Sequence, residues 1–282
     1  MGIDHLRQWL GRTETATEYL AASRAAKLAA TLDRADRPGE GDELPPLWHW
    51  LYFTPLAAQS ELGPDGHPRR GAFLPPVPLP RRMWAGGRLT FHHPLRLGQS
   101  VTRTSQIVDV SEKTGARGAL VFVTLRHSLA NAEGLAIEEE QDIVYREAAT
   151  TARPAALAAP VPAADWRLPA PTDPTLLFRY SAITFNGHRI HYDLPYATEV
   201  EGYPGLVVQG PLTATLLLDT WLRESGQVAR SYSFRGQAPL FSGDTLVLCG
   251  RQTDGGGELW AEGPGGYVAM SATVTCEADH AG

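Results

Sequence analysis

The sequence has little cysteine and no pattern that would favour disulfides or a metal site. Only two cysteines occur among its 282 residues, Cys249 and Cys276, and each lies in an apolar run typical of a strand. Two cysteines are too few for a disulfide framework, and no metal-ligand spacing accompanies them. We therefore expect two buried free thiols.

An excess of positive charge is also absent. The 25 Lys and Arg residues are outnumbered by 31 Asp and Glu residues, which gives a net charge of -6. Proteins that bind nucleic acid usually carry a basic excess or a basic stripe, so we expect no nucleic-acid partner. The basic pairs Arg69-Arg70 and Arg81-Arg82 are interpreted as solvated charge in loops.

Long apolar runs and cofactor motifs are missing as well. No stretch of about 18 or more apolar residues occurs, and residues 1–10 lack the continuous apolar region of a secretion signal. Gly-rich dinucleotide loops, clusters of metal ligands and serine nucleophile elbows are not found. The sequence thus predicts a cytoplasmic protein with no membrane contact, no metal and no cofactor.

The chain does contain enough apolar sequence for two domains. Its length suits two domains of ordinary size, and 43% of its residues are hydrophobic. Residues 148–173 are rich in Ala and Pro and have no hydrophobic period, and their prolines exclude a stable helix. We expect an N-terminal domain over residues 1–147, a linker over 148–173 and a C-terminal domain over 174–282.

Two segments suggest that the halves are repeats of each other. Residues 94–101 match residues 239–246 at a constant offset of 145, with Pro, Leu and Gly identical, Ser matching Thr and Val matching Leu. Each segment precedes a long strand-like run. We interpret the match as an internal repeat, with a chance likeness between two hairpin entries as the alternative.

Hydrophobic periods and turn residues place the elements. An Ala-rich stretch over residues 14–36 has helical spacing, and a loop dense in Pro and Gly follows over residues 38–80. A second helix is expected over 212–223, where Pro211 fits the first turn. Thr- and Val-rich runs predict strands over residues 87–92, 100–110, 119–129, 135–145, 231–234, 245–252, 259–262 and 267–276. The expected fold is α+β, a double hotdog in which each half wraps an antiparallel sheet around one long helix.

Polar residues are densest between Phe178 and Asp193. The run Asn186-Gly187-His188-Arg189-Ile190-His191-Tyr192-Asp193, followed by Val207-Val208-Gln209-Gly210, resembles a pattern of the MaoC-like hydratases and dehydratases. In that family the pattern is Asp-x-Asn-Pro-x-His-x-Asp and then a Gly-rich strand ending in His-Gly. The variant Thr-Phe-Asn-x-His-Arg-Ile-His-Tyr-Asp, with Leu47–Phe53 in the first half, is similar to the branch of mesaconyl-C4-CoA (3-methylfumaryl-CoA) and itaconyl-CoA hydratases. The resemblance covers both halves and implies addition of water to, or its removal from, the α,β-double bond of an acyl-CoA thioester.

The chemistry of that reaction assigns three roles. A base must activate water, an acid must deliver a proton to the α-carbon, and a donor must stabilise the enolate oxygen. His191 is the expected acid/base, since the unperturbed pKa of histidine is about 6.5. Asn186, five residues earlier, is expected to hold the water. The backbone N–H of Gly210 at a helix start is the expected donor to the enolate oxygen, because Pro211 has no N–H.

Two positions depart from the family pattern. Asn186 stands where the wider family has Asp, and Asn can hold a water but cannot take its proton. Either His191 alone performs the proton transfers or a carboxylate of the substrate assists, which would suit a branched C5 dicarboxylyl-CoA. Gln209 stands where the family has His, and its amide can orient a neighbour but cannot titrate.

The other polar residues of the cluster are assigned to substrate binding. These are Arg179, Tyr180, His188, Arg189, Tyr192, Asp193 and Gln209. Arg179 and Arg189 are candidates for contact with a substrate carboxylate, with structural ion pairs as the alternative. Asp193 is expected to pin His191 and the loop backbone. The aromatic residues within Trp48–Phe53 are expected in the core.

Three functions stay open on this evidence. A hydratase or dehydratase of a dicarboxylyl-CoA is favoured. The alternatives are a dehydratase of carrier-bound acyl chains in fatty-acid or polyketide assembly, and a catalytically weakened protein that binds acyl thioesters. A thioesterase could use the same fold, but the Asn-x-x-x-x-His spacing belongs to hydratases. Because only the second half carries the histidine motif, we expect one active site per chain, shaped in part by the first half. CoA would arrive as part of the substrate, and a homodimer is left open as the assembly state.

Overall fold

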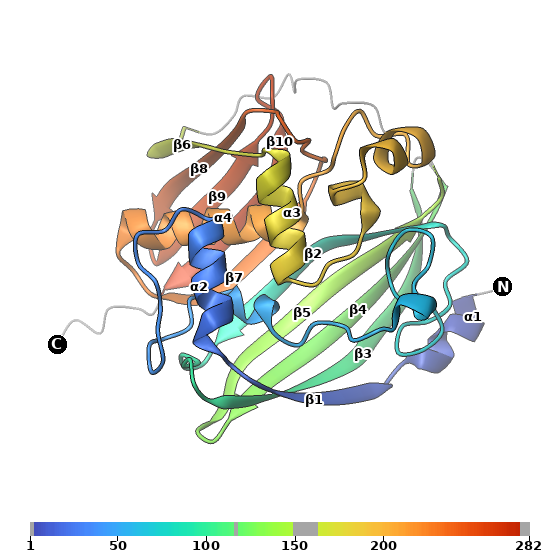
Figure 1. The fold of residues 1–282 in the computed structure, drawn as a ribbon, viewed down its shortest axis with the longest axis horizontal. Coiled ribbons are helices and arrows are strands. Elements are labelled where there is room, and N and C mark those ends of the chain that lie inside the picture. Colours follow the sequence, from blue (N-terminus) through green and yellow to red (C-terminus); the bar gives the residue numbers. More distant parts are fainter. Residues whose placement is uncertain (1–2, 116–117, 149–162, 277–282) are drawn as a thin grey trace.

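The structure, a computed structural model, describes residues 3–115, 118–148 and 163–276. Within these ranges, ten strands form one antiparallel sheet in the order β1-β3-β4-β5-β2-β7-β10-β9-β8-β6 (Figure 1). The strands are β1 (Thr13–Tyr19), β2 (Arg81–Phe91), β3 (Ser100–Gly115), β4 (Gly118–Asn131), β5 (Gly134–Arg146), β6 (Trp166–Ala170), β7 (Ala229–Gly236), β8 (Leu246–Thr253), β9 (Gly256–Glu262) and β10 (Val268–Cys276).

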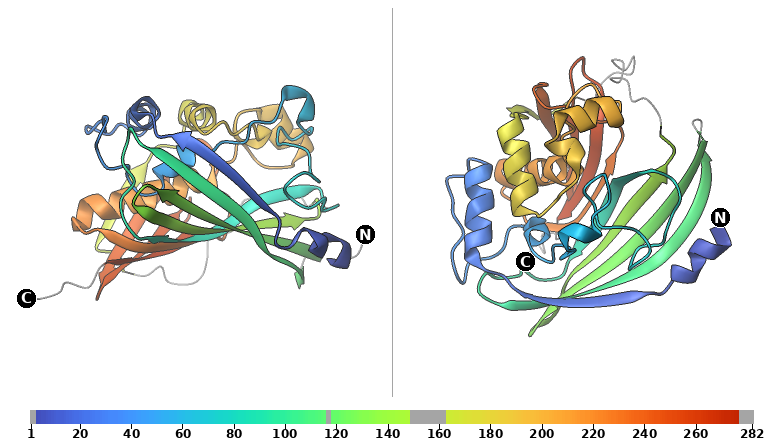
Figure 2. Two further views of the ribbon diagram at one scale, coloured as in Figure 1. Left: turned by 90° about the horizontal axis from the view of Figure 1, so that it is seen from below. Right: turned by 45° about the vertical axis from the view of Figure 1, so that its right-hand side comes forward.

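Helices pack on the concave side of this curved sheet (Figure 2). Helices α2 and α3 lie side by side, and α4 packs against β7, β8, β9 and β10. The helices are α1 (Ile3–Leu6), α2 (Ala22–Thr31), α3 (Pro174–Ile183) and α4 (Gly210–Ser225), and the short helical turns are η1 (Arg7–Trp9), η2 (Trp48–Leu51), η3 (Gln59–Glu61), η4 (Arg189–His191) and η5 (Tyr196–Val200). None of the helices in the described ranges has the length and apolarity that a membrane crossing requires.

The sheet order repeats one five-strand unit. From one edge it runs β1-β3-β4-β5-β2, and from the other β6-β8-β9-β10-β7, so β2 and β7 meet in the middle. Equivalent backbone hydrogen bonds are made by residues of the two matched segments, which are related by the predicted offset of 145. The carbonyl of Leu95 accepts from the N–H of Leu44 at 2.7 Å, and that of Leu240 accepts from Val208 at 2.9 Å. The offset match is therefore a structural repeat.

The two halves differ in their central helix. After the paired segment of the second half, α4 runs for 16 residues and buries most of its side chains. After the equivalent segment of the first half, the chain makes only the short helical turns η2 and η3, joined by loops, before it reaches β2. The expectation of one long helix in each half is thus wrong for the first half.

The start of the chain also departs from the expected helix over residues 14–36. Residues 13–19 form the edge strand β1, and only 22–31 are helical. The run Thr-Glu-Thr-Ala-Thr-Glu-Tyr is rich in β-branched Thr, and its pairing with β3 aligns Thr side chains, including Thr17 with Thr102 at 2.9 Å. Such cross-strand Thr pairs favour a strand over the helix that the Ala content suggested.

The expected linker over 148–173 contains a strand. Residues 166–170 form β6, which pairs with β8 at the edge of the sheet. Pro169 is tolerated there because an edge strand has one side that needs no N–H. Residues 149–162 of that expected linker lie outside the described residues.

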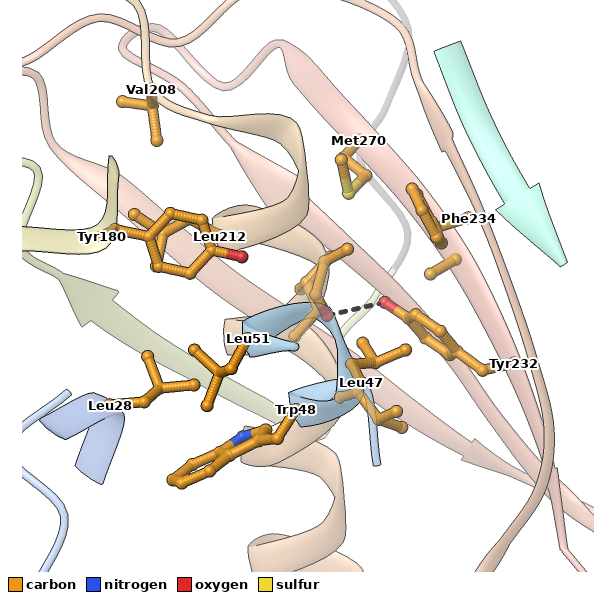
Figure 3. Packing of buried hydrophobic residues seen from close by; sticks show 14 of the residues in the cluster. Leu28, Leu47, Trp48, Leu51, Tyr180, Val208, Leu212, Tyr232, Phe234 and Met270 are labelled. Atoms are coloured by element: carbon orange, nitrogen blue, oxygen red, sulfur yellow. Dashed lines mark hydrogen bonds between the residues drawn. The ribbon is translucent and has the colours of Figure 1, made fainter. Parts of the chain in front are cut away.

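One apolar core is shared by both halves. Figure 3 shows Leu47, Trp48 and Leu51 of the first half packed among Leu28, Tyr180 and Leu212. Trp48 and Tyr52 are fully buried, as expected, whereas Trp50 and Phe53 also face the cavity described below. Neither cysteine is in a disulfide within the described residues; Cys249 is buried as expected, and Cys276 is half-buried.

Candidate active site

One large cavity lies between the two halves. Its volume is about 2210 Å³, and its walls include β2, β4 and β5 of the first half together with α3, the turn at 184–192 and the start of α4. Among the expected site residues, the walls include Asn186, His191, Gly210, Tyr180, His188, Arg189 and Tyr192. The polar motif of residues 186–192 and the start of α4 therefore line the same cavity.

His191 ends the short turn η4 and is 7% exposed. Its Nδ1 lies 2.7 Å from the carbonyl oxygen of Val207. A carbonyl only accepts, so Nδ1 carries the proton and Nε2 remains as the acceptor on a side chain that lines the cavity. Burial lowers the pKa of His191 to about 4, which outweighs the opposite effect of the hydrogen bond that the ring donates to Val207. At neutral pH the ring is uncharged and has the form that a base requires.

Asn186 follows α3 through Phe185, whose φ of 52° is left-handed. Its backbone N–H donates to the carbonyl of Ser181 at 2.8 Å, and its Oδ1 accepts from the N–H of His188 at 3.0 Å. This local turn fixes the orientation of the side-chain amide. The NH₂ group is then the part left to a ligand, so Asn186 can hold a water by donating to its oxygen.

Gly210 is the first residue of α4. The first N–H groups of a helix have no partner within the helix, and the helix dipole makes this end favourable for negative charge. A Cβ built on Gly210 would meet nothing closer than the carbonyl oxygen of Trp84, at 4.0 Å. The space beside this backbone is therefore open to a ligand. The hydrogen bond from the N–H of Val207 to the carbonyl of Ile190, at 3.0 Å, holds the segment before α4 against the turn that carries His191.

Gln209 is not brought to the cavity wall. It is fully buried, and its Nε2 donates to the carbonyl of Leu177 at 2.8 Å and to the hydroxyl of Ser181 at 3.0 Å. Both partners belong to α3. Gln209 therefore ties the start of α4 to α3, and the expectation that it contacts substrate is wrong.

The two arginines assigned to a substrate carboxylate are placed differently. Arg189 donates to Oδ2 of Asp193 at 2.7 Å and to the carbonyl of Pro64 at 3.0 Å, so it is a structural ion pair at the cavity wall. Arg179 is exposed on α3 and does not line the cavity. Asp193 pins Arg189 and the N–H of Tyr196; its side chain holds the loop without binding His191 or lining the cavity.

The remaining expected residues do reach the cavity. Tyr180 is buried in α3, and Tyr192 donates from its hydroxyl to the carbonyl of Gly187 at 2.9 Å. The ring of His188 stands edge-on to that of His191, with 5.4 Å between the ring centres. All three therefore shape the space around His191.

A loop of the first half docks on this motif, which the sequence did not reveal. The N–H of Arg189 donates to the carbonyl of Asp65 at 2.9 Å, and the ring of His67 lies 4.1 Å from that of His188. Gly66 has a φ of 85°, and any Cβ there would collide with the carbonyl of Gly187. Residues 38–80, expected as a loop, thus contribute directly to the site. An Asp-Gly-His sequence inside such a loop was the signal that could have indicated a role.

Asp65, His67 and His188 are the one group in the described part of the chain whose ligand atoms would suit a metal ion, all lying within 4.8 Å of one another. Both oxygens of Asp65 already accept from His67, one from its backbone N–H at 3.1 Å and one from Nδ1 at 3.0 Å. The carboxylate therefore has its partners within the protein. Burial lowers the pKa of His67 despite this bond.

The basic pairs are not simply solvated, which corrects their interpretation. Arg81 and Arg82 begin β2, and Arg81 forms a buried ion pair with Glu201. Arg70 donates to backbone carbonyls that include Val77 at 2.7 Å. Arg82 lines the cavity. For Arg81 and Arg82, their position at the start of a strand was the available signal. Arg69 is exposed on its loop, as expected.

Comparisons with known proteins place the chain in a family and test its fold. The sequence profile of the family described as hydroxyacyl-thioester dehydratase type 2 matches residues 47–242. A mesaconyl-C(4)-CoA hydratase of Chloroflexus aurantiacus is 49% identical over 94% of this chain and 96% of its own. Among solved structures, HtdX of Mycobacterium tuberculosis has a TM-score of 0.67 at 20% identity, over 94% of this chain and all of that one. Another protein of that organism, described as a double hotdog, has a TM-score of 0.55 at 14% identity, over 95% and 96% of the two chains. The α+β double-hotdog fold is confirmed.

Proposed function

The chain belongs to the hydroxyacyl-thioester dehydratase type 2 family, and from this premise we propose that it adds water to the α,β-double bond of a branched C5 dicarboxylyl-CoA. The substrate class is supported by the 49% identity to a protein named mesaconyl-C(4)-CoA hydratase. Dehydration is the same reaction reversed and uses the same groups.

The geometry supports a reaction in which one histidine moves one proton. Asn186 donates to the oxygen of a water, and Nε2 of His191 takes a proton from it. The water oxygen forms a bond to the β-carbon while the electron pair of the double bond moves toward the thioester. The N–H of Gly210 stabilises the enolate oxygen, and His191 returns its proton to the α-carbon. Water is consumed, and the enzyme ends as it began.

The observation that carries this proposal is the contact of His191 with Val207. It fixes Nδ1 as a donor at 2.7 Å, while burial keeps the ring neutral. A base in that form needs no adjacent carboxylate, so the absence of an Asp at position 186 does not remove the chemistry. A catalytically weakened binder would have no need for this arrangement.

Asn186 also suits the proposed substrate. In 3-methylfumaryl-CoA the β-carbon, which receives the water, carries the second carboxylate. A carboxylate at position 186 would face that group and repel it, whereas a neutral amide does not. We include in the proposal that no cofactor is needed, that CoA arrives with the substrate, that the protein acts in the cytoplasm, and that a homodimer is the assembly to test.

A second candidate function is dehydration of a carrier-bound acyl chain. It is favoured by the size of the cavity, about 2210 Å³, which exceeds what a five-carbon acyl group requires. The two candidates differ in substrate but share His191, Asn186 and Gly210. Assays with different substrates therefore distinguish the two candidates, whereas substitution of these three residues would impair both.

The test is incubation with mesaconyl-C4-CoA, itaconyl-CoA, crotonyl-CoA and a crotonyl carrier protein, following loss of the enoyl-thioester absorbance. We expect the first or second substrate to have the highest kcat/KM, with no change after dialysis against a metal chelator. A preference for the carrier-bound substrate would favour the second candidate. No turnover of any thioester, with binding retained, would overturn both.

A further inference from the structure

The proposed substrate brings a second negative charge into the cavity. In the C4 thioester this carboxylate is attached to the β-carbon, so it must lie beside the water held by Asn186 and His191. A carboxylate that is partly removed from water is costly unless a cation or several hydrogen bonds compensate it. The expected partners were Arg179 and Arg189, but the first is exposed and the second is paired with Asp193.

The arginines that line the cavity differ in what they already bind. Arg103 lies 3.9 Å from Glu14, Arg146 donates to the hydroxyl of Tyr203 at 3.5 Å, and Arg69 is exposed on its loop. Arg82 is half-buried, and within the described ranges no carboxylate lies at ion-pair distance from it. Beside it the hydroxyl of Tyr145 offers a neutral partner for one of its N–H groups. The other N–H groups of the planar fork are left for a ligand.

Arg82 is at the catalytic end of the cavity. A small hollow that adjoins the cavity is lined by Arg82, Asp65 and His188 together. Burial lowers the pKa of His188, and the neighbouring histidines and Arg82 add to this effect. Arg82 is therefore close enough to act electrostatically on His188, whose ring centre is 5.4 Å from that of His191.

The surroundings of Arg82 hold surplus positive charge. On β5 its register partner is Tyr145, whose ring lies 5.1 Å from the guanidinium of Arg70. Arg70 binds backbone carbonyls and no carboxylate within the described chain. Burial lowers the pKa of Arg70, and the charge of Arg82 lowers it as well. The nearby Asp65 accepts a hydrogen bond from His67, whose pKa burial lowers, so this carboxylate sets one negative charge against the two positive charges of Arg70 and Arg82.

We infer that Arg82 binds the second carboxylate of the substrate and so makes the enzyme selective for dicarboxylyl over monocarboxylyl thioesters. The inference rests on the proposed function, since it names the recognition element of the same site. Arg82 enters from β2 of the first half, whereas His191, Asn186 and Gly210 come from the second. Each half would thus bind a different part of the acyl group.

The experiment compares Arg82→Gln and Arg82→Lys with wild type on mesaconyl-C4-CoA and crotonyl-CoA, which lacks the second carboxylate. Loss of a hydrogen bond to a charged group corresponds to a decrease in kcat/KM of about 10- to 150-fold. We expect that decrease for Arg82→Gln on mesaconyl-C4-CoA only, with crotonyl-CoA within about threefold of wild type. Arg82→Lys should recover part of the activity, because it keeps the charge but loses the bidentate geometry.

Arg88→Gln is the matched control. Arg88 is on the same strand but exposed, and it pairs with Glu140 and Asp142 on the outside of the sheet. This variant removes the same charge and should leave both substrates unaffected. Inhibition by a saturated dicarboxylyl-CoA provides a second readout that needs no turnover. Its Ki should rise in Arg82→Gln and stay unchanged in Arg88→Gln.

The outcomes separate the two claims. If wild type hydrates mesaconyl-C4-CoA and Arg82→Gln lowers kcat/KM equally for both substrates, the role of Arg82 is overturned and the proposed function stands. If wild type hydrates crotonyl-CoA but not the dicarboxylyl substrates, the proposed substrate class fails and the inference fails with it.

Discussion

Nδ1 of His191 lies 2.7 Å from the carbonyl oxygen of Val207, so a backbone group orients the ring that we propose as the acid/base. Val207 is in turn held by the hydrogen bond from its own N–H to the carbonyl of Ile190, the residue before His191. The ring and its partner are therefore locked to each other by the same short stretch of chain. No second side chain is needed to select the tautomer.

The first prediction concerns the catalytic side chains. His191→Ala should lower kcat by about 10²- to 10⁴-fold, the range for one general acid/base. Asn186→Ala should cost less, because it removes water positioning and leaves the base in place. Steady-state kinetics on mesaconyl-C4-CoA measure both, with circular dichroism as the check on folding. A smaller loss for His191→Ala than for Asn186→Ala would contradict the assignment of the base.

The second prediction concerns the amide at position 186. Asn186→Asp restores the family's usual carboxylate but places a negative charge beside that of the substrate. We expect kcat/KM for mesaconyl-C4-CoA to fall more than that for crotonyl-CoA. Equal effects on the two substrates would show that Asn186 does not serve to accommodate a second carboxylate.

The third prediction concerns the helix start. A methyl group at Gly210 has no protein atom closer than 4.0 Å, so Gly210→Ala should fold with near-normal stability. The methyl group would occupy the space beside the N–H that the thioester oxygen must approach. We expect kcat to fall by about 10-fold or more, within the range for weakening one oxyanion donor. An unchanged kcat would remove Gly210 from the mechanism.

The fourth prediction concerns stability and pH. Burial lowers the pKa of His191 and that of His127 to about 4, whereas unfolded histidine titrates near about 6.5. Between these values the unfolded chain binds more protons, so both groups make the folded state less stable as the pH falls from about 6.5 to about 4. Asp219 opposes this trend, because burial raises its pKa to about 6.

The contribution of one histidine can be isolated. His127→Asn removes one of the two groups, so its free energy of unfolding should depend less steeply on pH, by up to about 1.4 kcal/mol per pH unit. Urea denaturation at pH 7, 5.5 and 4.5 measures the slope for wild type and variant. Parallel slopes would show that His127 is not buried as a neutral ring.

The fifth prediction concerns the docked loop. Gly66→Ala combines a left-handed φ of 85° with a collision against Gly187. Gly71→Ala is the matched control, since Gly71 has a φ of 101° but only Pro76 nearby, at 3.8 Å. Both should lose about 1–2 kcal/mol of stability from backbone strain. Only Gly66→Ala should also lower kcat/KM, because it displaces the loop from the catalytic turn; similar kinetics in the two variants would contradict this.

The parts of the site that could be read from the sequence are those that lie close together in it. Asn186, His191 and Gly210 fall within 25 residues, and local turns and the backbone hydrogen bond from Val207 to Ile190 bring them together. His67 and Arg82 lie more than 100 residues away from them. Their contribution depends on how the two halves pack, which no local pattern records.

The fold shows the same limit. The long strands and α4 follow from their hydrophobic and turn patterns. The Ala content of residues 14–36 predicted a helix where β1 forms. The strand depends on the cross-strand partners of Thr13–Tyr19, which lie on β3, far along the chain. The missing helix of the first half could not be inferred from the repeat, since η2 and the loop after it carry no equivalent of the α4 sequence.

The pairing of β2 with β7 has a consequence for how the protein can evolve. Equivalent strands meet there in antiparallel order, as they would at the two-fold axis of two identical subunits. In such an assembly every mutation appears twice, so a cavity opened in one subunit opens in the other. Covalent linkage frees each copy from that constraint. One copy can keep its buried helix as a rigid frame for proton transfer while the other gives up its helix and makes room for a different acyl group.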